Sequence, residues 1–159
     1  MDAYSSAGWT AVFASIAGAS AALTGLLFVA LSLNLSQVLK GRGWIGRAVE
    51  VLVLLVSAMV ISILLLMPAQ GTQTLAIEIF SIAVPLAAVL AYIHIRSPHR
   101  RLFALRVFGG QLGSIFLIVG GVSLLAQNGG GLYWVVPALL IAMVSAIIGA
   151  WVVLVEAAR

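Results

Sequence analysis

The sequence contains five long apolar segments, which constrain the fold more than any other feature. Each has about 20 or more mostly apolar residues, the length that an α-helix needs to cross the hydrocarbon core of a bilayer. A helix also satisfies its backbone hydrogen bonds internally, as a segment in lipid must. We therefore predict an all-α integral membrane protein, a five-transmembrane-helix bundle that forms a single domain over residues 1–159. Its expected spans are about 9–33, 45–67, 75–95, 103–126 and 133–155.

The composition agrees with a membrane protein. Apolar residues make up 64% of the chain and charged residues 8%, whereas a soluble domain is roughly 45–50% apolar and about 25% charged. A solvated globular surface and intrinsic disorder are therefore both excluded. The chain has no cysteine, so disulfides and thiolate metal sites are excluded as well.

Basic residues lie in alternate connections between the spans. The connections 69–73 and 127–131 carry no charge. The others contain or adjoin Lys40, Arg42, Arg47, Arg96, Arg100, Arg101 and Arg106, and Arg159 ends the chain. Five spans place all of them on one side of the membrane, which the positive-inside rule assigns to the cytoplasm. We predict the N-terminus outside and the C-terminus in the cytoplasm. The net charge of +4 then reflects orientation, and nucleic acid is not an expected partner.

Small residues at a spacing of four favour close helix packing in lipid. Three spans carry such pairs: Gly18 and Ala22, Gly109 and Gly113, and Ala142 and Ala146. These pairs either pack helices within one chain or join several copies. Three stripes are more than a minimal bundle needs, so we expect a homo-oligomer.

Glu50 lies about five residues into the second span, toward the cytoplasmic side. A charge within a span is costly and needs a partner. Arg106, at a similar depth in the fourth span, and Arg47, three residues before Glu50, are the two candidate partners. Such a pair either fixes the register of the helices or lines a charged inner vestibule.

Glu78 lies one turn into the third span from the outer side, where the sequence offers no Lys or Arg. It is therefore protonated, hydrogen-bonded, extended to the surface or in contact with water. A sharper hypothesis makes it a site that attracts cations or handles protons at an outer mouth. Gln111, near the middle of the fourth span, and Asn34, at the cytoplasmic end of the first, either bond helices together or line a pore.

The residue types needed for catalysis do not form any recognisable set. His94 and His99 are five residues apart at a helix end, a poor spacing for two metal ligands on one helical face, and neither lies deep in a span. No phosphate-binding loop is present. We expect no enzyme activity, no cofactor and no metal site.

The segment 18–35 reads GASAALTGLLFVALSLNL, residues 47–50 read RAVE and residues 66–70 read LMPAQ. These features resemble a family of small uncharacterised bacterial membrane proteins, some of which are labelled modulators of a membrane protease. The resemblance covers the first two spans. It implies the bacterial inner membrane, brings no catalytic residues, and directs attention to Asn34, Arg47, Glu50 and Gln70.

Two functions fit these observations. The first is an ion channel or pore formed by self-association in the lipid bilayer, with Glu78 at its outer mouth and Glu50, Arg47 and Arg106 at its inner mouth. The second is a non-catalytic interaction or regulatory subunit that docks onto a larger membrane complex, such as a protease or transporter. Small-residue stripes combined with polar groups at several depths favour the channel.

Overall fold

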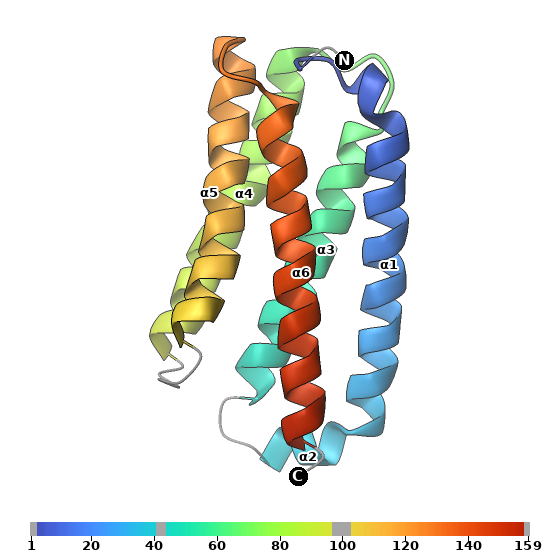
Figure 1. The fold of residues 1–159 in the computed structure, drawn as a ribbon, viewed down its shortest axis with the longest axis vertical. Helices are drawn as coiled ribbons and strands as arrows, with labels where there is room; N and C mark the ends of the chain where they lie inside the picture. Colours follow the sequence, from blue (N-terminus) through green and yellow to red (C-terminus); the bar gives the residue numbers. More distant parts are fainter. Residues whose placement is uncertain (1–2, 41–43, 97–102, 158–159) are drawn as a thin grey trace.

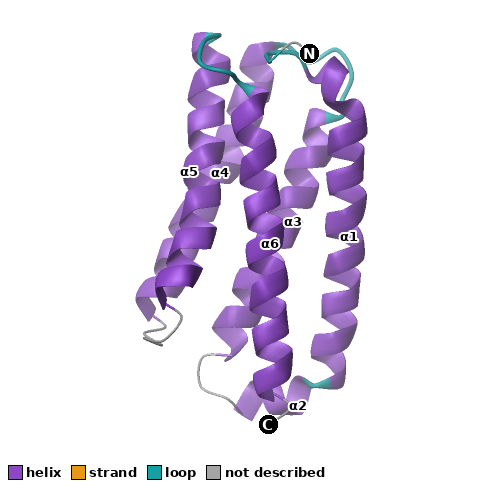
Figure 2. Cartoon of the chain, viewed as in Figure 1, coloured by secondary structure: helices purple, strands orange, loops and turns teal. Residues whose placement is uncertain are grey.

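The computed structural model describes residues 3–40, 44–96 and 103–157, and these residues are helical apart from their connections (Figure 2). Successive long helices run antiparallel, so that the chain runs up and down along one axis (Figure 1). The elements are the 3₁₀ turn η1 (Ser6–Trp9) and the helices α1 (Thr10–Leu33), α2 (Leu35–Lys40), α3 (Trp44–Leu65), α4 (Thr72–Arg96), α5 (Phe103–Ala126) and α6 (Leu132–Ala157).

Within the described residues, five helices are long and apolar enough to cross a membrane, as the sequence predicted. Their ends lie within a few residues of the expected bounds. The short helix α2 was not expected. Asn34 forms the corner before it, because its side-chain amide donates to the Ala30 carbonyl at 2.9 Å while its own carbonyl accepts from the Val38 amide at 3.0 Å.

Helix α3 lies at the centre of the bundle and packs against α1, α4 and α6, whereas α5 packs between α4 and α6 (Figure 1). In the most apolar stretch of α3, half of the residues are buried, which is the largest share among the five long helices. Its buried apolar face consists of Ala48, Val51, Leu54, Leu55, Ala58, Ile61 and Leu65. The centre of the bundle is therefore a packed apolar core.

Glycine and alanine bring α5 and α6 close together. A Cβ atom added at Gly113 would lie 3.3 Å from the Ala138 carbonyl oxygen, and one added at Gly120 would lie 2.8 Å from Cγ2 of Val135. Ala138 is fully buried. The absence of side chains at these glycines allows the close approach that favours helix association in lipid.

The N-terminal segment is bonded to the connection between α5 and α6. The Leu132 amide donates to the Ala3 carbonyl at 2.9 Å, and the Gly130 amide donates to the Tyr4 hydroxyl at 3.2 Å. Gly129, Gly130 and Gly131 have φ values of +85°, +105° and +45°, a region that residues with a Cβ rarely adopt. This connection therefore holds the N-terminal segment across one end of the bundle.

The two ends of the bundle differ in charge. The described Lys and Arg residues all lie at one end, where α2 and α4 finish and α3 and α5 begin: Lys40, Arg47, Arg96 and Arg106. We call this the basic end. The opposite, base-free end contains the N-terminal segment and the connections after α3 and α5, and the two chain termini lie at opposite ends (Figure 1).

Candidate functional site

A buried polar pair joins α3 to α4 near the basic end. Nε2 of His94, in the last turn of α4, lies 3.0 Å from Oε1 of Glu50 in α3. Only 5% of each residue is exposed. The pair is a hydrogen bond when His94 is neutral and a salt bridge when His94 is protonated. Either form gives the buried carboxylate a partner and fixes α3 against α4.

His94 was not among the partners predicted for Glu50. Those were Arg47, which is half-buried, and Arg106, whose side chain lies outside the described residues. Gly110 of α5 packs beside the imidazole, since a Cβ added there would lie 3.7 Å from Cε1 of His94. A signal was present in the sequence, because a histidine in the last turn of the third span lies at the same end as Glu50.

Glu78 has a different partner near the base-free end. Nε2 of Gln70, in the connection between α3 and α4, lies 2.9 and 3.0 Å from the two carboxylate oxygens of Glu78. Among the alternatives that the sequence left open, the structure therefore contains the hydrogen-bonded one. Of the residues to which the family resemblance drew attention, Gln70 is the one that contacts Glu78.

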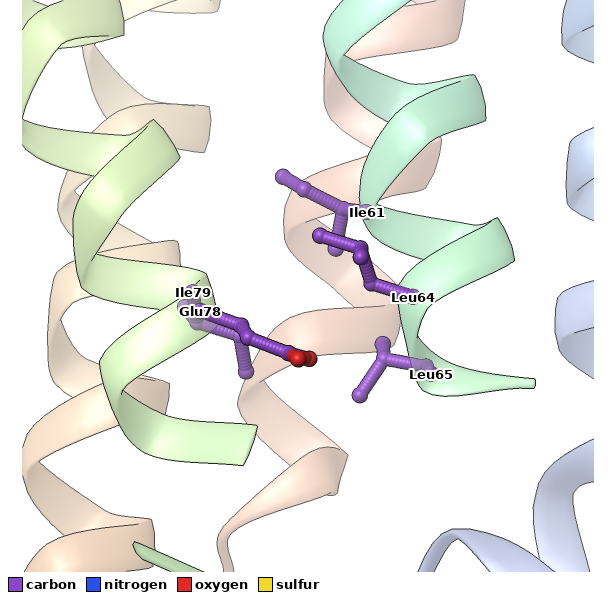
Figure 3. A pocket seen from close by; sticks show the side chains of 5 residues that line it. All are labelled: Ile61, Leu64, Leu65, Glu78 and Ile79. Atoms are coloured by element: carbon purple, nitrogen blue, oxygen red, sulfur yellow. The ribbon is translucent and has the colours of Figure 1, made fainter. Parts of the chain in front are cut away.

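The Glu78 side chain extends from α4 toward the last turn of α3 at Leu65 (Figure 3). The hollow beside it is lined by Ile61, Leu64, Leu65 and Ile79 and has no space for a water molecule. The carboxylate therefore lies between an apolar wall and the amide of Gln70.

A polar hollow opens at the base-free end, where three segments of the chain meet. Its volume is about 410 Å³, and it is lined by Tyr4, Ser5, Gln70, Gly71, Thr72 and Gln127. The Thr72 hydroxyl donates to the Tyr4 carbonyl at 3.4 Å, which links α4 to the N-terminal segment. We call this hollow the polar cup. Gln70 both lines the cup and contacts Glu78.

The remaining residues predicted to line a pore lie on different elements of the bundle. Asn34 bonds within its own helix corner, and Gln111 is a half-buried residue of α5. Glu50 and Glu78 lie near opposite ends of the interface between α3 and α4. Asn34, Glu50 and Glu78 thus each have a local hydrogen-bond partner.

The predicted packing residues divide into two groups. Gly109 and Gly113 face α6, and Ala142 and Ala146 are buried. By contrast, Gly18 and Ala22 of α1 are exposed, and a Cβ added at Gly18 would have no atom within 4 Å. The stripes on α5 and α6 are therefore used within the chain, whereas the stripe on α1 remains uncovered.

An apolar groove of about 330 Å³ adjoins that uncovered helix. It runs between α1 and α6 over Leu55 of α3, and residues such as Leu26, Ala30, Ala146 and Trp151 line it. Trp151 is 66% exposed at its edge. Helices α1 and α6 thus pack less closely against each other than α5 and α6 do.

The chain is an all-helical bundle. Its five long apolar helices indicate a multi-pass membrane protein. Comparisons with protein-family models, with curated proteins and with solved structures find no match. Among the described residues there is no group of three or more His, Asp or Glu side chains that could hold a metal ion.

Proposed function

We propose that this chain is a non-catalytic membrane subunit that associates through α1, with a second copy of itself as the partner. The observation that supports this proposal is the uncovered small-residue face of α1. The first span is the least buried of the five, because only 17% of the residues in its most apolar stretch are buried. A helix that packs weakly on its own bundle has a face available for another helix.

The exposed face follows a spacing that suits helix pairing. Residues separated by alternating steps of four and three lie on one face of a helix, and this face contacts the helix packed against it. Small side chains at these steps let two backbones approach closely. The exposed residues at this spacing in α1 are Ala11, Ser15, Gly18, Ala22, Gly25, Val29 and Ser32.

The hydroxyl groups on this face are already bonded. Ser15 Oγ donates to the Ala11 carbonyl at 2.8 Å, and Ser32 Oγ donates to the Phe28 carbonyl at 2.8 Å. Neither hydroxyl needs water, so the face is suited to packing against a helix rather than to lining an aqueous pore. Within the chain, Glu50 and Glu78 also have polar partners. These contacts support a structural role for both carboxylates.

The absence of native cysteine allows a direct test of association. Ala22→Cys places a thiol on the α1 face, and Val84→Cys places one on an exposed position of α4 at a similar distance along its helix. We expect oxidation in a bilayer to join copies of Ala22→Cys in much higher yield than copies of Val84→Cys. Equal yields, or a monomeric mass in lipid nanodiscs, would overturn the proposal.

A measurement of ion flux in proteoliposomes distinguishes a non-conducting subunit from a channel. We expect protein in verified orientation to give no more flux than protein-free vesicles. Flux that changes selectivity with Glu78→Gln would instead establish the channel with its mouth at Glu78. The proposed setting is the bacterial inner membrane, with the basic end in the cytoplasm because of the positive-inside rule.

A further inference from the structure

The apolar groove between α1 and α6 lies in the half of the bundle nearest the basic end. It is lined by residues between Leu23 and Ala30 of α1 and between Ala146 and Leu154 of α6, in the second half of each helix, and by Leu55 of α3. All of the lining residues are apolar. The volume of about 330 Å³ is within the range of small-molecule sites, roughly 300–1,000 Å³. The groove therefore has the size and the surface to hold part of an apolar ligand.

The groove and the small-residue face occupy different sides of α1. The residues of α1 that line the groove follow the spacing i, i+3, i+4 and i+7, which defines one face of a helix: Leu23, Leu26, Leu27 and Ala30. At 3.6 residues per turn, this face lies about a third of a turn from Gly18 and Ala22. The proposed association through α1 therefore does not use the groove.

Helix α2 lies at the basic end and contacts both α1 and α6 (Figure 1). Leu35 and Leu39, one turn apart, are 53% and 59% exposed, whereas Val38 is buried. Exposed leucines on a short helix at the end of a membrane span lie among the lipid tails at the membrane interface. Lys40 is the last residue of α2 and so belongs to the layer of the lipid headgroups.

Positive charge exceeds negative charge at this end of the bundle. Within the described helices, four Lys or Arg residues and two carboxylates lie here: Lys40, Arg47, Arg96, Arg106, Glu50 and Glu156. Glu50 contacts His94 in the interface between α3 and α4. Lysine and arginine next to a span attract anionic lipid headgroups. The charges therefore favour an anionic lipid over a zwitterionic one at the end of the groove.

We propose that the groove binds one acyl chain of an anionic phospholipid, with the phosphate of this lipid at the basic end near Lys40. Aliphatic side chains offer water no hydrogen-bond partner, whereas an acyl chain gives them dispersion contacts. Trp151, 66% exposed in the lining, carries an indole N–H that only donates, which suits an ester oxygen of the lipid. A phospholipid thus matches both the apolar groove and the charge beyond its end.

Filling the groove tests the acyl chain. Ala150 lines the groove, and Ala88 is exposed on α4 at a similar distance from the basic end, so Ala150→Phe and Ala88→Phe form a matched pair. The variants and the wild type are extracted from vesicles of an equal mixture of phosphatidylglycerol and phosphatidylcholine, and native mass spectrometry counts the retained lipids. We expect the wild type and Ala88→Phe to prefer phosphatidylglycerol about fivefold, the effect of one lysine near a charged headgroup. Ala150→Phe should lose most of this lipid, and retention equal to that of Ala88→Phe would overturn the proposal.

Removing one positive charge tests the position of the headgroup. Lys40→Gln removes the cation at the end of α2, and Arg96→Gln removes one at the end of α4, where the guanidinium lies 4.8 Å from the centre of the Tyr92 ring. In the same measurement we expect Lys40→Gln to retain the two lipids nearly equally and Arg96→Gln to keep the preference of the wild type. A preference that survives in Lys40→Gln, or that falls equally in both variants, would contradict the proposal.

Photo-labelling of the wild type keeps the test independent of how the variants fold. Phosphatidylglycerol with a diazirine on one acyl chain is mixed into phosphatidylcholine vesicles that contain the full chain, and peptide mapping locates the label. We expect the label to concentrate on residues 23–30 and 146–154. A label spread evenly over the exposed residues of all five long helices would show that no chain is held in the groove.

A second copy of the chain is the competing occupant of the groove, and cross-linking distinguishes it from lipid. A copy in the groove would make Ala150→Phe lower the cross-linking of Ala22→Cys while lipid retention stays unchanged, and this result would overturn the proposal. We expect unchanged cross-linking and lost lipid. If Ala22→Cys alone fails to cross-link, only the association of α1 is contradicted, because the lipid measurements do not depend on it.

Discussion

The imidazole of His94 and the carboxylate of Glu50 lie 3.0 Å apart although the two residues are 44 positions apart in the chain. Both are buried, one in the last turn of α4 and the other in the second turn of α3. An ionisable side chain in an apolar bundle is tolerated when it has a partner. The pair therefore specifies how the basic ends of α3 and α4 meet.

This contact predicts a large effect of removing the carboxylate. We expect Glu50→Ala to lower the free energy of unfolding by about 3 kcal/mol, because the change leaves the His94 ring buried without its acceptor. The measurement is unfolding in mixed detergent micelles, followed by helical circular dichroism. In a double-mutant cycle with His94→Ala we expect a coupling energy of about 1–2 kcal/mol. Additive effects of the two substitutions would show that the contact contributes nothing to stability.

A smaller effect is expected at the other carboxylate. Glu78 is half-buried and contacts the amide of Gln70, a residue in the connection before α4. We expect Glu78→Ala to lower the free energy of unfolding by about 1 kcal/mol, the typical contribution of a hydrogen bond. The same micelle titration, run beside Glu50→Ala, compares the two. Equal losses for both variants would contradict the difference in burial and partners.

Glycine substitutions distinguish the packed stripe from the uncovered one. In Gly120→Ala the new methyl group would lie 2.8 Å from Cγ2 of Val135, and we expect a loss of about 1–3 kcal/mol from overpacking. Gly18→Ala is the matched control, because its methyl group meets open space and alanine favours the helix by up to about 1 kcal/mol. Unfolding measured at low protein concentration keeps association out of the comparison. A destabilised Gly18→Ala together with an unchanged Gly120→Ala would reverse the assignment.

The connection after α5 gives a prediction about the N-terminal segment. Gly131 has a φ of +45°, and a Cβ at this position would press against the Ala3 carbonyl. We expect Gly131→Ala to cost about 1–2 kcal/mol and to speed hydrogen exchange at the Leu132 amide, which donates to Ala3. Gly71→Ala, where the added methyl group has no atom within 4 Å, should leave that exchange rate unchanged. Protection that persists in Gly131→Ala would show that the segment is held by other contacts.

Orientation in the membrane is the last prediction. The chain ends lie at opposite ends of the bundle (Figure 1), and the positive-inside rule places the basic end in the cytoplasm. We expect a reporter fused after the C-terminus to be active in the cytoplasm and one fused before the N-terminus to be active outside. A C-terminal reporter that is active outside would contradict this orientation.

Part of the candidate site was accessible from the sequence. Glu50 and Glu78 were identified because charges within apolar spans are rare and need a local explanation. Two of their contacts were not predicted: the predicted partners of Glu50 were the cations Arg47 and Arg106, and no partner was named for Glu78. The structure adds a histidine on a neighbouring helix beside Glu50 and an amide in a connection beside Glu78. Partners of this kind depend on how the helices pair, which no spacing along one helix reveals.

The sequence by itself determined the five long helices and their approximate ends. Length and apolarity suffice for this, because a backbone in lipid must satisfy its hydrogen bonds within each span. The tertiary structure decided which faces are covered. Gly113 of α5 lies against α6 while Gly18 of α1 lies open, although both belong to similar stripes. The physical reason is that lipid is as apolar as the core, so the hydrophobic pattern does not distinguish a buried face from a lipid-facing one, and only the packing of the helices does.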